Sequence, residues 1–170
     1  MRLESNVQWI KEEELWHLTY GEERLVSLGK ATKGIRPFTL EGRKFNLIKK
    51  SGFGTTWQIV NERNHLLSQL KFGFWNSKGN IRFNDGRVFE CNYKTLPKLI
   101  IDIKDLRYGE KLISYQVDNS SSRPIPKLVL HKSEMFTDKL LFLLSLGMAL
   151  MLDMFENEMD FTTYILLTTA

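Results

Sequence analysis

The sequence predicts a mainly β protein, a closed antiparallel barrel that encloses one hydrophobic C-terminal helix. Two observations lead to this prediction. From about residue 15 to residue 130, short runs of alternating apolar and polar residues are separated by turn signals, a pattern typical of antiparallel sandwiches and barrels. Near the end of the chain, residues 140–152 form a helix-length segment that is apolar on every face, so protein or lipid must surround it.

The predicted strands are short and regularly spaced. Turn residues separate them, most clearly at Asp85-Gly86, because both residues tolerate the positive φ of a tight hairpin. Residues 6–14 show no clear alternation and are interpreted as an irregular arm. Strands are expected at residues 15–20, 24–28, 37–40, 45–49, 56–60, 66–74, 76–79 with 81–83, 88–93, 97–103, 112–117 and 125–130.

One helix is expected over residues 138–156. Thr137 or Asp138 can accept a hydrogen bond from a free amide of the first turn, and Asp138 also suits the positive end of the helix dipole. A helix of this extent is about 28 Å long, enough to pass through a small barrel from end to end. Ser145 and Gly147 are small, which lets the barrel wall approach the helix closely.

The lipid bilayer is an alternative environment for this helix. Its uncharged run covers only residues 140–152, between Lys139 and Asp153, whereas a transmembrane helix needs about 20 predominantly apolar residues. A second apolar segment, residues 161–167, is shorter still. A closed sheet around the helix satisfies both patterns with one core. Burial in a barrel is therefore favoured, and a membrane anchor is the alternative.

Five segments of the chain resemble one known family. They are Phe45-Asn46-Leu47-Ile48-Lys49-Lys50, Thr56-Trp57-Gln58-Ile59-Val60-Asn61, residues 66–70, Asp85-Gly86-Arg87-Val88-Phe89-Glu90 and the apolar helix. The chain resembles the tubby C-terminal-like superfamily here, in particular the LURP-one-related branch that also includes phospholipid scramblases. The resemblance covers roughly residues 15–156 and implies a barrel of about twelve strands around a central helix, and the chain length suits one domain over residues 1–170. The chain lacks the cysteine cluster and the acidic calcium loop of scramblases, which argues against scrambling.

Catalytic chemistry is not predicted. His17, His65, His131 and Cys91 are widely scattered, so neither a metal site nor a cofactor is expected. Cys91 is the only cysteine and is interpreted as a packing residue. The absence of an intrachain disulfide and of an apolar leader favours a cytoplasmic protein. We expect a non-enzymatic binding or scaffold module.

A basic stretch gives the one hint of a ligand. Its cations have Glu41 as the sole nearby acid. If the 29–34 loop and the 41–42 hairpin project from one end, they form a cationic rim that attracts anionic head groups at about 1 kcal/mol per charge. The other reading of the stretch is a solubilising surface. The residues are Lys30, Lys33, Arg36, Arg43, Lys44, Lys49 and Lys50.

The expected partners follow from this rim and from the mildly basic net charge of +4. They are an anionic phospholipid or membrane surface, which would place the protein at the periphery of a membrane, or a protein partner. Nucleic acid is not favoured, because Trp57, Phe72, Phe74 and Trp75 have the spacing of strand residues in a core rather than of a stacking surface. The alternative function is a membrane-anchored, scramblase-like protein with the C-terminal helix in the bilayer.

Overall fold

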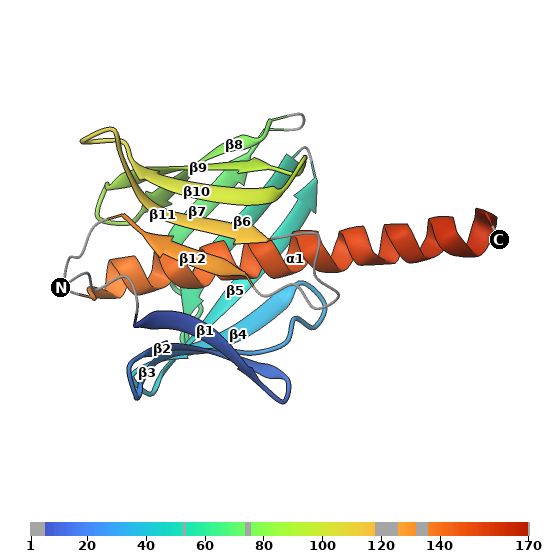
Figure 1. The fold of residues 1–170 in the computed structure, drawn as a ribbon. Coiled ribbons are helices and arrows are strands. Elements are labelled where there is room, and N and C mark those ends of the chain that lie inside the picture. Colours follow the sequence, from blue (N-terminus) through green and yellow to red (C-terminus); the bar gives the residue numbers. More distant parts are fainter. Residues whose placement is uncertain (1–5, 53, 74–75, 118–125, 132–135, 170) are drawn as a thin grey trace.

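The computed structural model shows twelve strands and one helix (Figure 1). It describes residues 6–52, 54–73, 76–117, 126–131 and 136–169, with the side chains of the helix described up to residue 155. The elements are β1 (Val7–Glu12), β2 (Leu15–Tyr20), β3 (Glu23–Leu28), β4 (Ile35–Leu40), β5 (Arg43–Gly52), β6 (Gly54–Asn61), β7 (Leu66–Phe72), β8 (Lys78–Phe83), β9 (Val88–Lys94), β10 (Leu99–Asp105), β11 (Glu110–Val117), β12 (Lys127–Leu130) and α1 (Asp138–Thr169).

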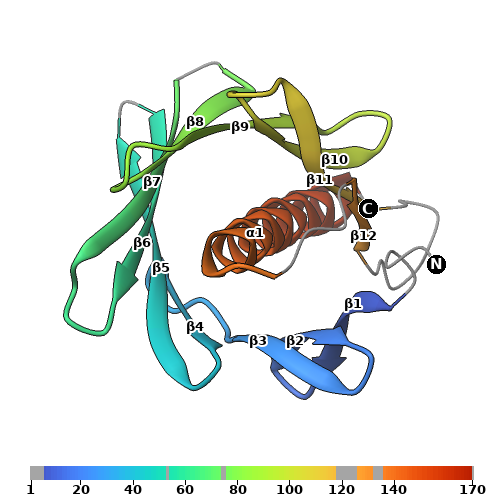
Figure 2. The same cartoon turned by 90° about the vertical axis from the view of Figure 1, so that its left-hand side faces the viewer.

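The strands form one antiparallel sheet in which each strand pairs with the next along the chain, in the order β1 to β12. The sheet curls into a barrel around α1 (Figure 2). β1 and β12 lie beside each other at the seam, but no hydrogen-bonded ladder joins them among the described residues. The predicted mainly β barrel around a C-terminal helix is therefore confirmed, with the barrel nearly rather than fully closed.

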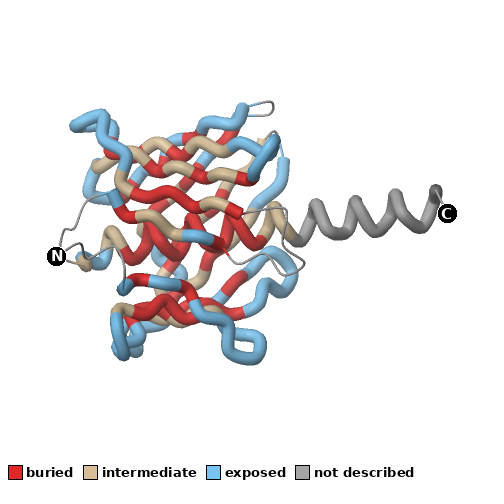
Figure 3. Tube along the Cα trace, in the orientation of Figure 1, coloured by how far each residue is buried: buried red, intermediate tan, exposed pale blue. Residues whose placement is uncertain are grey.

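The core lies between the inner wall of the barrel and α1. Residues 141–152 of the helix are all buried, on every face (Figure 3). The one polar side chain of that stretch, Ser145, donates its hydroxyl to the carbonyl of Leu141 at 2.7 Å, so no polar atom of the stretch is left unsatisfied. The all-round apolar pattern thus reflects a helix surrounded by protein.

The closest approach between wall and helix is at Gly147. A Cβ atom placed there would lie 2.6 Å from Cε2 of Tyr115 on β11, so only glycine fits. The Tyr115 hydroxyl donates to the carbonyl of Leu144 at 2.7 Å and accepts a hydrogen bond from Nε1 of Trp9 at 2.8 Å. Burial raises the pKa of Tyr115 far above its ordinary range. The contact ties β1, β11 and α1 together and confirms the predicted role of the small residue.

The start of the helix is as predicted, and its end is not. Oγ1 of Thr137 accepts a hydrogen bond from the amide of Leu140 at 3.2 Å, as a capping residue does. The predicted end near Glu156 is wrong, because α1 continues to Thr169. No glycine or proline follows Gly147, and acidic residues near a C-terminus cost only about 0.3–1 kcal/mol each. Among the described residues, no helix is long and apolar enough to cross a membrane.

Strand β5 holds α1 near both ends of the barrel. Arg43 at its start forms two hydrogen bonds with the Asp138 carboxylate, at 2.8 and 2.9 Å, and Nζ of Lys49 lies 2.7 Å from Oδ2 of Asp153. Arg43 and Lys49 are about 20 Å apart along an extended strand. Asp138 and Asp153 are about 22 Å apart along a helix. The two spacings match, so one strand can pair with both helix positions.

Two strand predictions need correction. Residues 6–14 are not an irregular arm, since β1 occupies Val7–Glu12; only Val7 and Trp9 of this strand are buried, which makes its alternation too short to recognise. The single strand β8 begins at Lys78 rather than at residue 76, and β7 ends at Phe72. Residue 74 of the predicted strand lies outside the described residues.

Candidate functional site

The seven predicted rim residues do not form one rim. The 29–34 loop and the 41–42 hairpin are joined by β4, so they lie at opposite ends of the barrel: Ile35 pairs with Ile48, and Leu40 pairs with Arg43. We call the end that contains Asp138 the helix entry end, and the end that contains Asp153 the helix exit end. Arg43 and Lys44 lie at the entry end, while Lys30, Lys33, Lys49 and Lys50 lie at the exit end.

Two of the predicted residues serve the structure of the barrel. Arg36 is only 4% exposed, and its guanidinium donates to the carbonyl of Gly29 at 3.0 Å. Lys49 is partly buried, is paired with Asp153, and has its ammonium 5.8 Å from the centre of the Trp57 ring. Neither cation is presented to a ligand at the surface.

At the entry end, three cations are matched with carboxylates: Arg43, Arg87 and Lys139. The hydrogen bonds between Arg43 and Asp138 raise the pKa of Arg43 and lower the pKa of Asp138. Lys139 forms an ion pair with Asp85, and this hydrogen bond lowers the pKa of the Asp85 carboxyl.

A third pair at the same end joins Arg87 to Asp105, with 2.7 Å between Nη2 and Oδ2. Asp105 is buried, and it also accepts a hydrogen bond from the backbone amide of Arg107. These contacts hold the first turn of α1 and the neighbouring hairpins in place, so Arg43, Arg87 and Lys139 are used within the protein.

At the exit end, the cations are mostly unmatched. Lys30, Lys33 and Lys50 are exposed, and among the described residues the only carboxylate that forms an ion pair with one of them is that of Glu14, 3.9 Å from Nζ of Lys30. The turn between β9 and β10 brings two further exposed lysines to the same end. We call this set the lysine end: Lys30, Lys33, Lys50, Lys94 and Lys98.

The sequence prediction missed Lys94 and Lys98, although the signal was available. In a sheet whose strands pair in chain order, alternate connections lie at the same end of the barrel. The connections that follow β3, β5 and β9 therefore share an end. Leu96, between the two missed lysines, is 82% exposed. The β1–β2 turn, with Glu12, Glu13 and Glu14, lies at this end as well.

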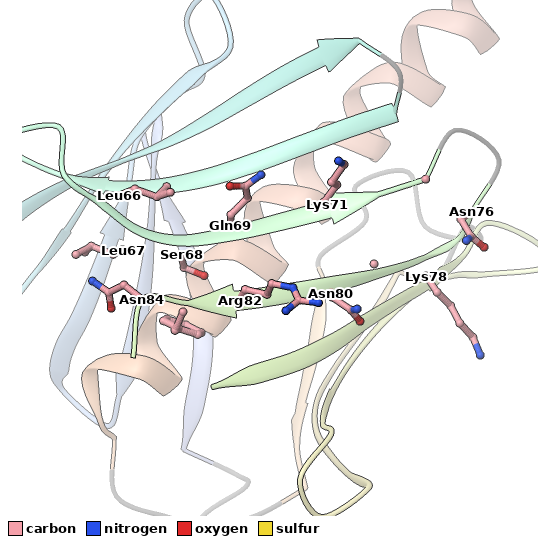
Figure 4. Close-up of a pocket in the computed structure, with 13 residues that line it drawn as sticks. Leu66, Leu67, Ser68, Gln69, Lys71, Asn76, Lys78, Asn80, Arg82 and Asn84 are labelled. Atoms are coloured by element: carbon pink, nitrogen blue, oxygen red, sulfur yellow. The ribbon is translucent and has the colours of Figure 1, made fainter. Parts of the chain in front are cut away.

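A groove of about 710 Å³ runs along the wall over β7 and β8 (Figure 4). None of the described residues that line it is an aspartate or a glutamate. Besides the hydroxyl of Ser68, its polar side chains are three cations and four carboxamides, which no motif in the sequence had indicated. They are Lys71, Lys78 and Arg82, with Gln69, Asn76, Asn80 and Asn84.

Serine and histidine side chains meet at two further places. Nδ1 of His17 lies 2.8 Å from Oγ of Ser27, its partner in the β2–β3 ladder. Ser114 donates to Asp102 at 2.6 Å and lies 2.9 Å from Nε2 of His131, but its side chain is only 3% exposed. A serine so covered offers no nucleophile to a substrate, and both contacts are interpreted as bonds between neighbouring strands.

Within the described ranges, no three His, Cys, Asp or Glu side chains gather into a possible metal site. Cys91 is fully buried, and burial raises the pKa of its thiol to about 12, with smaller effects of Asp102 and Glu90. A thiol with so high a pKa is a packing residue rather than a nucleophile.

Comparison of the chain with models of known families, with curated proteins and with solved structures gives no match. The resemblance to the tubby C-terminal-like superfamily thus stays a prediction. The role of the protein has to be inferred from the surface of its barrel.

Proposed function

We propose that the protein is a non-enzymatic binding module that attaches to anionic membrane surfaces through the lysine end of its barrel. One observation carries the proposal: five exposed lysines gather at the exit end, and four of them form no ion pair with a carboxylate among the described residues. The entry-end cations Arg43, Arg87 and Lys139 are bound to carboxylates. In the described part of the chain, Lys33, Lys50, Lys94 and Lys98 form no ion pair with a carboxylate.

The expected strength of this attachment is moderate. A lysine near an anionic bilayer contributes about 1 kcal/mol, and the attraction falls off within a Debye length. The five lysines together supply about 5 kcal/mol, less what the acidic β1–β2 turn opposes. Binding should therefore be reversible and should weaken strongly as salt is added.

Leu96 adds an apolar contact to this surface. It lies between Lys94 and Lys98 in the connection from β9 to β10, and most of it is exposed. If Leu96 inserts at the boundary between head groups and acyl chains, burial of its apolar surface would strengthen the attachment to the membrane. The lysines would bring the barrel to the bilayer, and Leu96 would hold it there.

Co-sedimentation with vesicles tests the proposal. The native protein should bind phosphatidylserine-containing vesicles at low salt and should not bind pure phosphatidylcholine vesicles. In the double variant Lys33→Glu/Lys98→Glu, two charges are reversed, and the partition coefficient should fall by at least about tenfold.

The matched control is Lys44→Glu/Arg63→Glu, which changes net charge equally but at the entry end. Both control residues are exposed, and neither forms an ion pair in the described part of the chain. It should keep most of the binding. Equal losses in the two variants would show a response to net charge alone, and failure of the native protein to bind at low salt would refute the proposal.

A further inference from the structure

We infer that the groove over β7 and β8 is a separate binding site, for the phosphate ester of a sugar or another small polyol. Its volume of about 710 Å³ lies within the range of about 300–1,000 Å³ that small-molecule sites occupy. It is on the wall of the barrel and runs from Leu66 and Asn84 at the entry end to Asn76 and Lys78 at the exit end, and none of the five residues of the lysine end lines it. The inference does not depend on that function.

The floor of the groove is an alternating array of cations and amides. In the β7–β8 ladder, Lys71 lies opposite Asn80, and Gln69 lies opposite Arg82. Directly opposed side chains on one face have their Cβ atoms about 5 Å apart, and diagonal ones about 7–8 Å. Lys71 and Arg82 are thus diagonal neighbours with an amide beside each. Figure 4 shows these four side chains along the two strands.

The groove cations are available to an anion. Neither Lys71, Lys78 nor Arg82 forms an ion pair with a carboxylate among the described residues. The nearest carboxylate by register is that of Glu90, opposite Asn80 on β9, and it lies opposite Lys104 on its other side. A phosphate group between Lys71 and Arg82 would receive charge-assisted hydrogen bonds, two of them from the planar guanidinium.

The carboxamides indicate what else the ligand carries. Each offers an acceptor oxygen and a donor NH₂, the combination that pairs with hydroxyl groups, which both donate and accept. Gln69 and Asn80 flank the two cations, and Asn84 lies further along the groove. Leu66, Leu67 and Phe83 give one end an apolar lining. A bare phosphate ion would use the cations only, whereas a polyol phosphate would use both kinds of group.

Isothermal titration calorimetry of the full chain tests this site, with glucose 6-phosphate, glycerol 3-phosphate, glucose and inorganic phosphate as probes. At least one ester should bind more tightly than inorganic phosphate, and glucose should bind least. Arg82→Gln should weaken the ester by about 10- to 100-fold, the loss of a hydrogen bond to a charged group. Asn80→Asp should weaken it further, because it places a carboxylate between the cations.

Lys44→Gln, an exposed position at the entry end, is the matched control and should leave the affinity unchanged. Phosphatidylglycerol vesicles present the glycerol phosphate group on a lipid. If these vesicles bind in an Arg82-dependent way while neither soluble ester binds, the ligand comes from a lipid. That result overturns the soluble-ester form of the proposal. Equal affinity for inorganic phosphate and the esters, or full affinity in Arg82→Gln, overturns the site altogether. Arg82 and Asn80 are exposed on the wall, so both variants should fold.

Discussion

The two ends of the barrel use the same kinds of residue for different purposes. At the helix entry end, Arg43, Arg87 and Lys139 each lie against a carboxylate. At the helix exit end, Lys33, Lys50 and Lys98 are exposed and form no ion pair in the described part of the chain. Net charge alone is therefore a poor guide to function here. What matters is which cations are already bound within the protein.

Lys49 departs from this division, and the substitution with the largest expected effect on stability is made there. It lies at the exit end, yet it is bound to Asp153, and both side chains are 27% exposed. Lys49→Met keeps the apolar stem but leaves the Asp153 carboxylate without its partner. The free energy of unfolding in urea should fall by about 1–2 kcal/mol, with little change in vesicle binding.

A compensating variant separates this loss from a packing defect. In Lys49→Met/Asp153→Leu, no charge remains to be compensated, so most of the stability should return. If the double variant is no more stable than Lys49→Met, the pair does not stabilise the helix in the way described. A large loss of vesicle binding in Lys49→Met would instead assign this lysine to the binding surface.

The entry end should show smaller effects on stability. Arg43→Gln removes two hydrogen bonds to Asp138, but both side chains are about half exposed (49% and 51%), and water and salt screen the pair. We expect a loss of about 0.5–1 kcal/mol at low salt, which should shrink at high salt. Lys44→Gln, next in the strand, should change stability by less than about 0.5 kcal/mol. Equal effects of the two substitutions would contradict the ion pair.

Acidification should have the smallest effect on stability, and it should act through the carboxylates of the entry end. The pKa values of Asp85 and Asp138 are lowered by Lys139 and Arg43. Their stabilisation is therefore complete above the ordinary carboxyl pKa of about 3.9 and is lost as the pH falls through the lower native values. The melting temperature should drop on acidification below about pH 4, and Asp138→Asn should reduce that drop. An unchanged drop in this variant would show that other carboxylates dominate.

Most of the fold follows from patterns that a sheet and a helix impose on a sequence. Alternation and the Asp85-Gly86 turn indicate antiparallel hairpins, and the apolar segment from 140 to 152 indicates a surrounded helix. β1 is harder to recognise because only Val7 and Trp9 are buried and the strand continues into exposed, acidic residues. The end of the helix is equally hard to predict, because no glycine, proline or capping residue marks it in the sequence. The position at which the barrel stops covering the helix depends on strand residues far away in the sequence.

The binding surfaces are less accessible from sequence, and the reason is topological. Seven cations close together in the chain suggested one patch, but a single strand separates Lys33 from Arg43 and carries them to opposite ends. Lys94 and Lys98 are remote in sequence yet share the end with Lys50. The groove pairs Lys71 with Asn80 and Gln69 with Arg82, contacts that depend on the β7–β8 register and cannot be read from composition.

The order of the elements along the chain has a consequence for synthesis. The strands precede α1, but it is α1 that fills the space inside them. When the ribosome has released β12, the inner faces of the sheet, with residues such as Leu18, Leu70 and Ile101, have nothing to cover them. The nascent sheet then exposes apolar surface and is an aggregation-prone intermediate of the kind that chaperones bind. A chain interrupted before Asp138 should aggregate rather than fold, because the centre of the barrel is made after its wall.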